Sequence, residues 1–319
     1  MPRESIKGLF KLVKFNLNLL VVVTTTVGFL IASRGMVQFP LLWWTVSGTL
    51  LAACGSAALN QYMERHRDAR MVRTRKRPIP SGLFSPSVAL AIGLLTGISG
   101  VVMLAMHVNW LTALLALLTQ LIYLLWYTPM KIRNPLNTLV GGICGAIPPM
   151  MGFSAVYGYL PLGAWLLAAF LFVWQIPHFL ALSWMYREDY KHGGYQMLPS
   201  HDPQARFTFP IMLYYSLILL PIGLSLTVFG YSGWWYGYGS LLLGAALVYL
   251  GYKLVRGREY MDARRLFFAT VIYLPLMLLL MVLDIQPHGH SGNFPAETGS
   301  ISGEASSGLL QDTPEQAGH

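Results

Sequence analysis

The chain has 319 residues, of which 55% are hydrophobic and only 11% are charged, and its formal net charge at pH 7 is +9. Soluble domains carry about 25% charged residues, so this composition excludes a soluble globular protein and indicates a polytopic helical membrane protein. In a soluble protein such a positive charge would suggest a nucleic-acid partner. Here membrane topology explains it, and no nucleic-acid partner is expected.

Nine apolar stretches long enough to cross a bilayer follow one another along the chain. With the segments between them on alternate sides, 21 of the 22 Lys and Arg residues fall on one side and Arg34 alone on the other. The positive-inside rule assigns the basic side, with the N-terminus, to the cytoplasm. We predict an all-α bundle of nine transmembrane helices around a central cavity, with spans at residues 15–33, 40–60, 84–106, 110–128, 136–157, 160–184, 208–230, 235–253 and 266–283.

The second predicted span ends in a cluster of amide and carboxylate side chains. Asn60, Glu64 and Asp68 recur every four residues, so on a helix they lie along one face at its cytoplasmic end. Their oxygens are hard ligands of the kind that Mg²⁺ takes together with phosphate. A solvated topological loop and a diphosphate site at the membrane surface are the two interpretations. The basic residues that follow offer donors to phosphate: Arg70, Arg73, Arg75, Lys76 and Arg77.

The end of the fourth span brings more polar residues to the same membrane face. Tyr127, Lys131 and Arg133 lie there. Gly141 and Gly145 follow with a spacing of small residues that permits either close helix packing or room for a bulky ligand.

The sixth span carries a histidine inside the membrane. His178 comes about three turns before the charged end of the span, beside Trp174. Ionisable residues at such depth are costly and often functional, although a packing role is the alternative. Asp189, at the cytoplasmic end, is a candidate carboxylate for a second metal ion facing the first cluster.

The chain is expected to divide into an intramembrane domain, residues 1–283, and a polar tail, residues 284–319. The tail has no Lys or Arg and is rich in Gly, Ser and Pro, which is typical of disorder. An odd number of spans places it outside. His288 and His290 form an H-x-H pair, for which metal binding and a solvated tail are the two interpretations.

Taken together, these residues resemble the UbiA-type intramembrane prenyltransferases, and within them the heme O synthases. The resemblance covers residues 10–283. Four motifs carry it in the family's order: the Asn60–Glu64–Asp68 series with D-x-x-M-x-R-T-x-x-R-P from Asp68 to Pro78; Y-T-P-x-K from Tyr127 to Lys131; G-G-x-x-G-A-x-P-P from Gly141 to Pro149; and W-Q-x-P-H-F from Trp174 to Phe179, followed by Asp189 and M-L-P at Met197 to Pro199.

Four positions depart from the pattern of the family or of the wider superfamily. Glu64 stands where Asp is common, and Arg133 replaces an arginine that the family has one position earlier. His178 and Met185 stand at earlier acidic positions of the wider superfamily's second motif. That difference weakens the expectation of a complete second metal site and favours a heme acceptor.

The resemblance implies an enzyme that transfers the farnesyl group of farnesyl diphosphate to a vinyl group of heme B, with addition of water, giving heme O and diphosphate. It implies Mg²⁺ as cofactor, with Asn60, Glu64, Asp68 and Asp189 as its ligands. These four residues and Lys131 are the expected catalytic residues. The expected substrate contacts are Arg73, Arg77, Lys131 and Arg133 for the diphosphate, and His178 and Trp174 for heme.

The same resemblance implies a prokaryotic plasma (inner) membrane protein with its active-site loops in the cytoplasm. Its expected partners are farnesyl diphosphate, heme B, the lipid bilayer and an assembly with heme A synthase or a terminal oxidase. Two alternatives stay open: a polyprenyl transferase acting on a quinone precursor, and a transporter of an anionic lipid or porphyrin. A structural membrane scaffold explains neither charge cluster.

Overall fold

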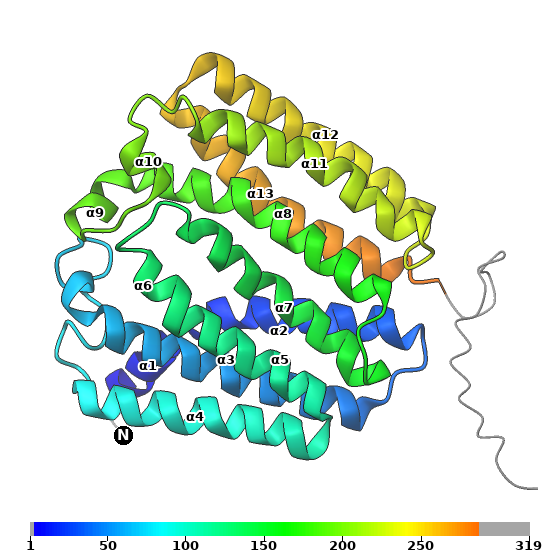
Figure 1. Cartoon of the computed structure of the whole chain (residues 1–319), viewed down its shortest axis with the longest axis horizontal. Coiled ribbons are helices and arrows are strands. Elements are labelled where there is room, and N and C mark those ends of the chain that lie inside the picture. Colours follow the sequence, from blue (N-terminus) through cyan, green and yellow to red (C-terminus); the bar gives the residue numbers. More distant parts are fainter. Residues whose placement is uncertain (1–2, 287–319) are drawn as a thin grey trace, which may run out of the picture. The chain divides into compact units, whose positions relative to one another are not determined.

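The computed structural model describes residues 3–286, and in this part of the chain all regular secondary structure is helical apart from one isolated bridge between Ser232 and Ile285 (Figure 1). Nine helices in it are long and apolar enough to cross a membrane, which confirms the predicted fold class of an integral membrane protein. The elements are α1 (Arg3–Leu12), α2 (Phe15–Ser33), α3 (Phe39–Asp68), α4 (Pro86–His107), α5 (Trp110–Leu121), the π-helix η1 (Ile122–Tyr127), α6 (Thr128–Met130), α7 (Asn137–Tyr157), α8 (Leu162–Met185), α9 (Arg187–His192), α10 (Leu198–His201), α11 (Thr208–Val228), α12 (Trp234–Gly257) and α13 (Tyr260–Leu283).

Several helices extend beyond the predicted spans because charged residues continue them at the membrane surface. α3 runs on to Asp68, so the acidic series lies on the helix itself. α13 begins at Tyr260, six residues earlier than predicted, and Asp262 in its first turn suits the positive end of the helix dipole. At the other end of α13, a carboxylate oxygen of Asp284 accepts the backbone N–H of Tyr236 at 2.8 Å. Residues 284–286 thus contact the helical domain, and the rest of the predicted tail lies outside the described residues.

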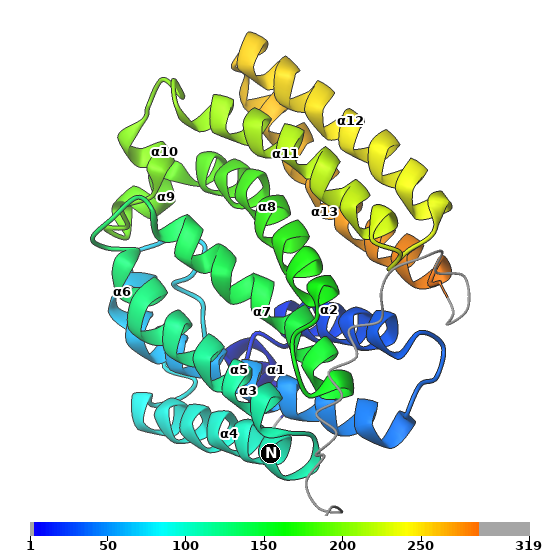
Figure 2. The ribbon, with the colours of Figure 1, turned by 45° about the vertical axis from the view of Figure 1, so that its right-hand side comes forward.

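Helices α2 to α5 and α7 form one part of the bundle, and α8 with α11 to α13 forms the other (Figure 2). Glycine allows the closest approaches within the first part. Gly55 of α3 faces the backbone of Gly97 on α4, and Gly28 of α2 faces the backbone of Pro149 on α7. A side chain at either glycine would overlap that backbone, so glycine lets these helices pack closely.

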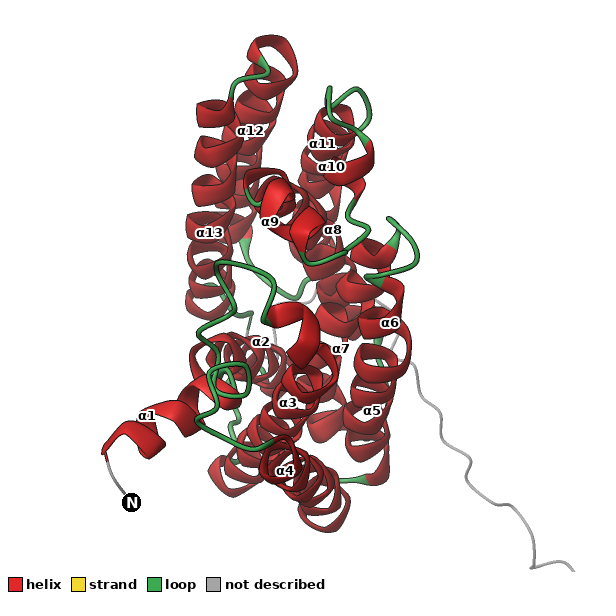
Figure 3. Ribbon diagram, turned by 90° about the vertical axis from the view of Figure 1, so that its left-hand side faces the viewer, coloured by secondary structure: helices red, strands yellow, loops and turns green. Residues whose placement is uncertain are grey.

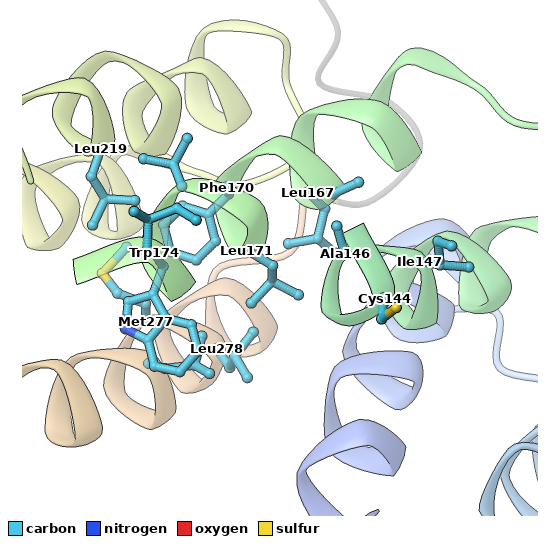
Figure 4. Packing of buried hydrophobic residues seen from close by; sticks show 14 of the residues in the cluster. Cys144, Ala146, Ile147, Leu167, Phe170, Leu171, Trp174, Leu219, Met277 and Leu278 are labelled. Atoms are coloured by element: carbon cyan, nitrogen blue, oxygen red, sulfur yellow. The ribbon is translucent and has the colours of Figure 1, made fainter. Parts of the chain in front are cut away.

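The largest buried cluster joins α7, α8 and α13 through apolar side chains (Figure 4). Phe170 and Trp174 of α8 pack with Met277 and Leu278 of α13, while Ile147 belongs to α7. Buried side chains of this kind leave little room between the helices, and therefore cavities within the bundle mark places where the packing is interrupted.

The short helices gather at one end of the bundle. Figure 3 looks onto this end and shows α9, α10 and the long connection from α3 to α4 grouped there. The connection carries most of the basic run, residues 70–77. Nearby, the fourth span changes from α-helix to the π-helix η1, a feature that often occurs at functional sites.

Candidate active site

A polar cavity of about 160 Å³ lies between the end of α3 and the connection from α3 to α4. It combines two carboxylates, four cationic side chains and four tyrosines, a composition suited to a charged ligand rather than to an apolar one. Its lining consists of Lys14, Glu64, Asp68, Met71, Arg73, Arg77, Tyr123, Tyr127, Lys131, Tyr190, Tyr195 and Met197.

Asn60, one turn before Glu64, is fully buried and its amide orientation follows from its partners. Nδ2 donates to Thr128 Oγ1 at 3.1 Å, and that hydroxyl donates in turn to the carbonyl of Tyr123 at 2.8 Å. A hydroxyl has one proton to give, so it accepts from the amide. The amide oxygen therefore points to the other side, where Lys14 Nζ donates to it at 2.7 Å. The π-helix thus orients the first residue of the acidic series.

Asp68 is also fully buried, and its two carboxylate oxygens differ. Oδ2 accepts from Arg77 Nη1 at 2.7 Å, whereas Oδ1 is buried and has no hydrogen-bond partner among residues 3–286. A buried polar atom without a partner is uncommon and calls for an explanation. An unpaired carboxylate oxygen beside a charged cavity fits the role of a cation ligand.

Glu64 forms a buried ion pair with a residue from the opposite wall. Lys131 Nζ lies 2.8 Å from Glu64 Oε1 and 4.4 Å from the ring centre of Tyr127. Burial alone would lower the pKa of Lys131, but the Glu64 carboxylate outweighs it, and the pKa lies well above its usual value. Lys131 therefore carries its charge in this cavity at neutral pH.

Each member of the Asn60–Glu64–Asp68 series thus has one basic side chain as its partner: Lys14, Lys131 and Arg77 respectively. Among the described residues there is no cluster of three or more His, Cys, Asp or Glu side chains arranged for a metal ion. Two carboxylates and an amide nevertheless match Mg²⁺, which takes one or two carboxylates and completes its shell with phosphate and water. A metal ion on these oxygens would displace the three basic side chains, and a diphosphate would offer them new partners.

Lys14 is a site residue that the sequence analysis missed, as are Tyr190 and Tyr195 of the cavity lining. In the sequence Lys14 counts only toward membrane topology. It connects α1 to α2 with a left-handed backbone (φ 47°), which is unfavourable for a residue other than glycine. Burial, followed by the nearby Arg77 cation, lowers the pKa of Lys14 to about 7. In the sequence it is a lysine directly beside an apolar span, and the neighbouring residues do not indicate that its side chain points into the bundle.

The connection above the cavity is held by α9. The guanidinium of Arg73 lies over the rings of Tyr186 and Tyr190, at 5.4 and 5.5 Å. Asp189 Oδ1 accepts the backbone N–H of Val72 at 2.8 Å. These contacts fasten the segment that carries Arg73 and Arg77.

Three of the residues predicted for the metal ion or the diphosphate are absent from the lining of this cavity. Asn60 is fully buried behind it, one turn before Glu64 on α3. Asp189 does not belong to its lining and uses one oxygen for the Val72 backbone, and Arg133 is exposed and also absent from the lining. The predicted metal role of Asp189 and the predicted diphosphate role of Arg133 remain predictions.

A second cavity, of about 310 Å³ and mostly apolar, lies deeper between the helices. It shares Lys14, Tyr123 and Tyr127 with the polar cavity, so these three residues stand where the two cavities meet. His178 and Trp174 line only the apolar cavity. The predicted diphosphate and heme residues are thus separated into adjoining compartments.

The two glycines of the fifth span line this apolar cavity as well. A side chain at Gly141 would meet the ring of Tyr127, and one at Gly145 would collide with the amide of Gln175. Both glycines therefore make room for neighbouring side chains of the cavity wall, which favours the close-packing interpretation at these positions.

The profile of the UbiA prenyltransferase family matches residues 21–274. A protoheme IX farnesyltransferase of Solibacter usitatus (strain Ellin6076) is 45% identical over 240 residues, covering 75% of this chain and 82% of the relative. A solved structure of digeranylgeranylglyceryl phosphate synthase is 15% identical, with a TM-score of 0.75 over 88% of this chain and 98% of that one. A UbiA homolog from Archaeoglobus fulgidus bound to GPP and Mg²⁺ is 12% identical, with a TM-score of 0.64 over 86% of this chain and 99% of that one. The chain belongs to the UbiA prenyltransferase family.

Proposed function

We propose that the chain is a protoheme IX farnesyltransferase, which joins the farnesyl group of farnesyl diphosphate to a vinyl group of heme B, with addition of water, to give heme O and diphosphate. The name of the 45% identical relative supports this activity. The observation that carries it is the pair of adjoining cavities. One is lined by carboxylates and cations, and the other is apolar and contains His178.

Asn60, Glu64 and Asp68 are the proposed Mg²⁺ ligands; the two carboxylates line the polar cavity, and Asn60 lies one turn before Glu64 on α3. The Mg²⁺ in the Archaeoglobus homolog and the unpaired Asp68 oxygen support this assignment. When bound, Mg²⁺ would stabilise the charge of the diphosphate leaving group. Asp189 is proposed as a further ligand on the family resemblance. Its Oδ1 accepts from the Val72 backbone, and its Oδ2 is buried without a hydrogen-bond partner among residues 3–286, like Oδ1 of Asp68.

Arg73, Arg77 and Lys131 are proposed to hold the diphosphate, and Arg133 joins them on the resemblance alone. The first three line the polar cavity. Their cations stabilise the negative charge that develops on the diphosphate oxygen as the bond to farnesyl C1 breaks. The electron pair of the heme vinyl group forms the new carbon–carbon bond at C1. Water then adds at the other vinyl carbon and loses a proton.

The apolar cavity is proposed to hold the farnesyl chain and the reacting edge of heme, with His178 and Trp174 on the heme side. Its apolar lining keeps bulk water from the allylic cation. The junction at Lys14, Tyr123 and Tyr127 is where C1 and the vinyl group would meet, since it borders both compartments.

The proposed orientation places this end of the bundle in the cytoplasm of a prokaryotic cell, with the plasma membrane as the bilayer. The partition of Lys and Arg supports it. Association with heme A synthase or a terminal oxidase is proposed on the resemblance only.

The direct test is to incubate membranes that contain the protein with heme B and farnesyl diphosphate, and to identify heme O by its mass. Heme O that depends on the protein supports the proposal. Prenylation of a quinone precursor without any heme O would contradict it, as would binding of both substrates without turnover.

Substitution of Arg73 or Arg77 is expected to impair the use of farnesyl diphosphate more than substitution of Arg65 does. Arg73→Ala and Arg77→Ala should each raise the KM for farnesyl diphosphate about 10-fold or more, because each removes a charge-assisted hydrogen bond to phosphate. Arg65→Ala is the matched control, since the guanidinium of Arg65 lies over its own neighbour Tyr62 and donates to that residue's carbonyl at 2.7 Å. Steady-state kinetics at saturating heme measures the difference. Equal small effects at all three positions would favour a solvated loop.

A further inference from the structure

The imidazole of His178 is held between two aromatic rings from different helices. The ring of Trp174, one turn earlier on α8, stacks on it at 5.1 Å and 18°, and the ring of Phe267 on α13 stacks at 5.0 Å and 23°. Stacking of this kind fixes the plane of the imidazole. It does not decide which ring nitrogen carries the proton.

Thr270 of α13 decides the position of that proton. Its Oγ1 lies 3.0 Å from His178 Nδ1 and 2.6 Å from the carbonyl oxygen of Phe267. The carbonyl can only accept, so the single hydroxyl proton of Thr270 points to it. The hydroxyl oxygen must then accept from His178, which assigns the proton of the neutral imidazole to Nδ1. The other nitrogen, Nε2, is left with a free lone pair.

The backbone of Thr270 holds the second aromatic residue of this group. Its carbonyl oxygen accepts from Trp174 Nε1 at 3.0 Å. Thr270 therefore contacts both Trp174 and His178, one through its backbone and one through its side chain. A substitution of the Thr270 side chain keeps the backbone carbonyl that accepts from Trp174. The contribution of the hydroxyl to His178 can therefore be measured separately.

We propose that Thr270 is a positioning residue, which holds His178 in the Nδ1–H form so that Nε2 points its lone pair into the apolar cavity and ligates the iron of heme B. The proposal rests on the proposed function, since it takes heme as the acceptor. His178 lines the apolar cavity and not the polar one, and Nε2 has no hydrogen-bond partner within residues 3–286. Histidines that bind a metal usually donate their other ring N–H to an acceptor that sets ring orientation and basicity.

The test is a titration of the full-length protein in lipid nanodiscs with ferric heme B, followed by visible absorption and electron paramagnetic resonance. His178→Ala should lose the spectrum of an imidazole-ligated iron. Thr270→Val keeps the shape and loses the acceptor, so heme affinity should fall about 10- to 100-fold. Thr270→Ser should restore it. Thr45→Val is the matched control, because Thr45 is a fully buried threonine of α3 that lines neither cavity.

Binding of farnesyl diphosphate, measured on the same samples, reports that each variant is folded and should equal the wild type throughout. A wild-type spectrum from His178→Ala would overturn iron ligation. Equal heme affinity for Thr270→Val and wild type, or equal losses for Thr270→Val and Thr270→Ser, would overturn the role of the hydroxyl. Each of these outcomes is compatible with heme O formation by the wild-type protein, so it would overturn this inference alone. A wild-type protein that forms no heme O would refute the proposed function itself.

Discussion

Asp68→Asn is expected to lower farnesyl transfer at least about 10²-fold, which corresponds to a loss of about 2.7 kcal/mol of transition-state stabilisation. Asn keeps the shape of the side chain but removes the negative charge that pairs with Arg77 and the unpaired oxygen proposed to hold Mg²⁺. Chelation by EDTA should abolish turnover for the same reason. Initial rates of heme O formation at several Mg²⁺ concentrations measure both effects, together with the Mg²⁺ dependence of farnesyl diphosphate binding.

Asp262→Asn is the matched control for this change. Asp262 is a buried carboxylate near the end of its helix, paired with Arg265 at 3.0 Å, and it lines neither cavity. Asp262→Asn should leave the Mg²⁺ dependence of heme O formation unchanged. Full activity of a chelated preparation, or an identical response of the two aspartates, would show that Asp68 does not act through a metal ion.

Lys131→Met is expected to reduce both stability and catalysis, and a second substitution separates the two. Removing the ammonium leaves Glu64 buried without its partner, and breaking a buried ion pair typically costs about 3–5 kcal/mol. The substitution also removes a positive charge from the polar cavity, so farnesyl diphosphate should bind more weakly. Thermal unfolding in detergent and substrate titration measure the two losses.

The double variant Lys131→Met, Glu64→Gln carries no buried unpaired charge at this pair, and so it should regain much of the lost stability. It should not regain activity, because both the cation and the carboxylate are absent. Lys191→Met, at an exposed position of α9, controls for the change in net charge and should resemble the wild type. Recovery of activity in the double variant would mean that the pair serves folding alone.

The transmembrane architecture was predictable because it depends on composition and local periodicity. Nine apolar stretches in the sequence correspond to nine membrane-length helices in the described part of the chain. The shared face of Asn60, Glu64 and Asp68 follows from helical spacing in the same way, once α3 continues to Asp68. Helix ends were less predictable, since α13 begins with charged residues that a hydropathy pattern does not count.

The number of spans, the acidic series on one helical face and the family motifs can be predicted from the sequence, because each depends on residues close to one another in the chain. Which basic side chain meets which oxygen depends on the folded arrangement of the helices. Lys14 reaches Asn60 from 46 residues away, and Thr270 reaches His178 from 92 residues away. The fold also separates His178 from the polar cavity and leaves Asn60, Asp189 and Arg133 outside that cavity's lining. The physical reason is that such contacts are set by how whole helices pack against one another, and local residue spacing carries no information about that packing.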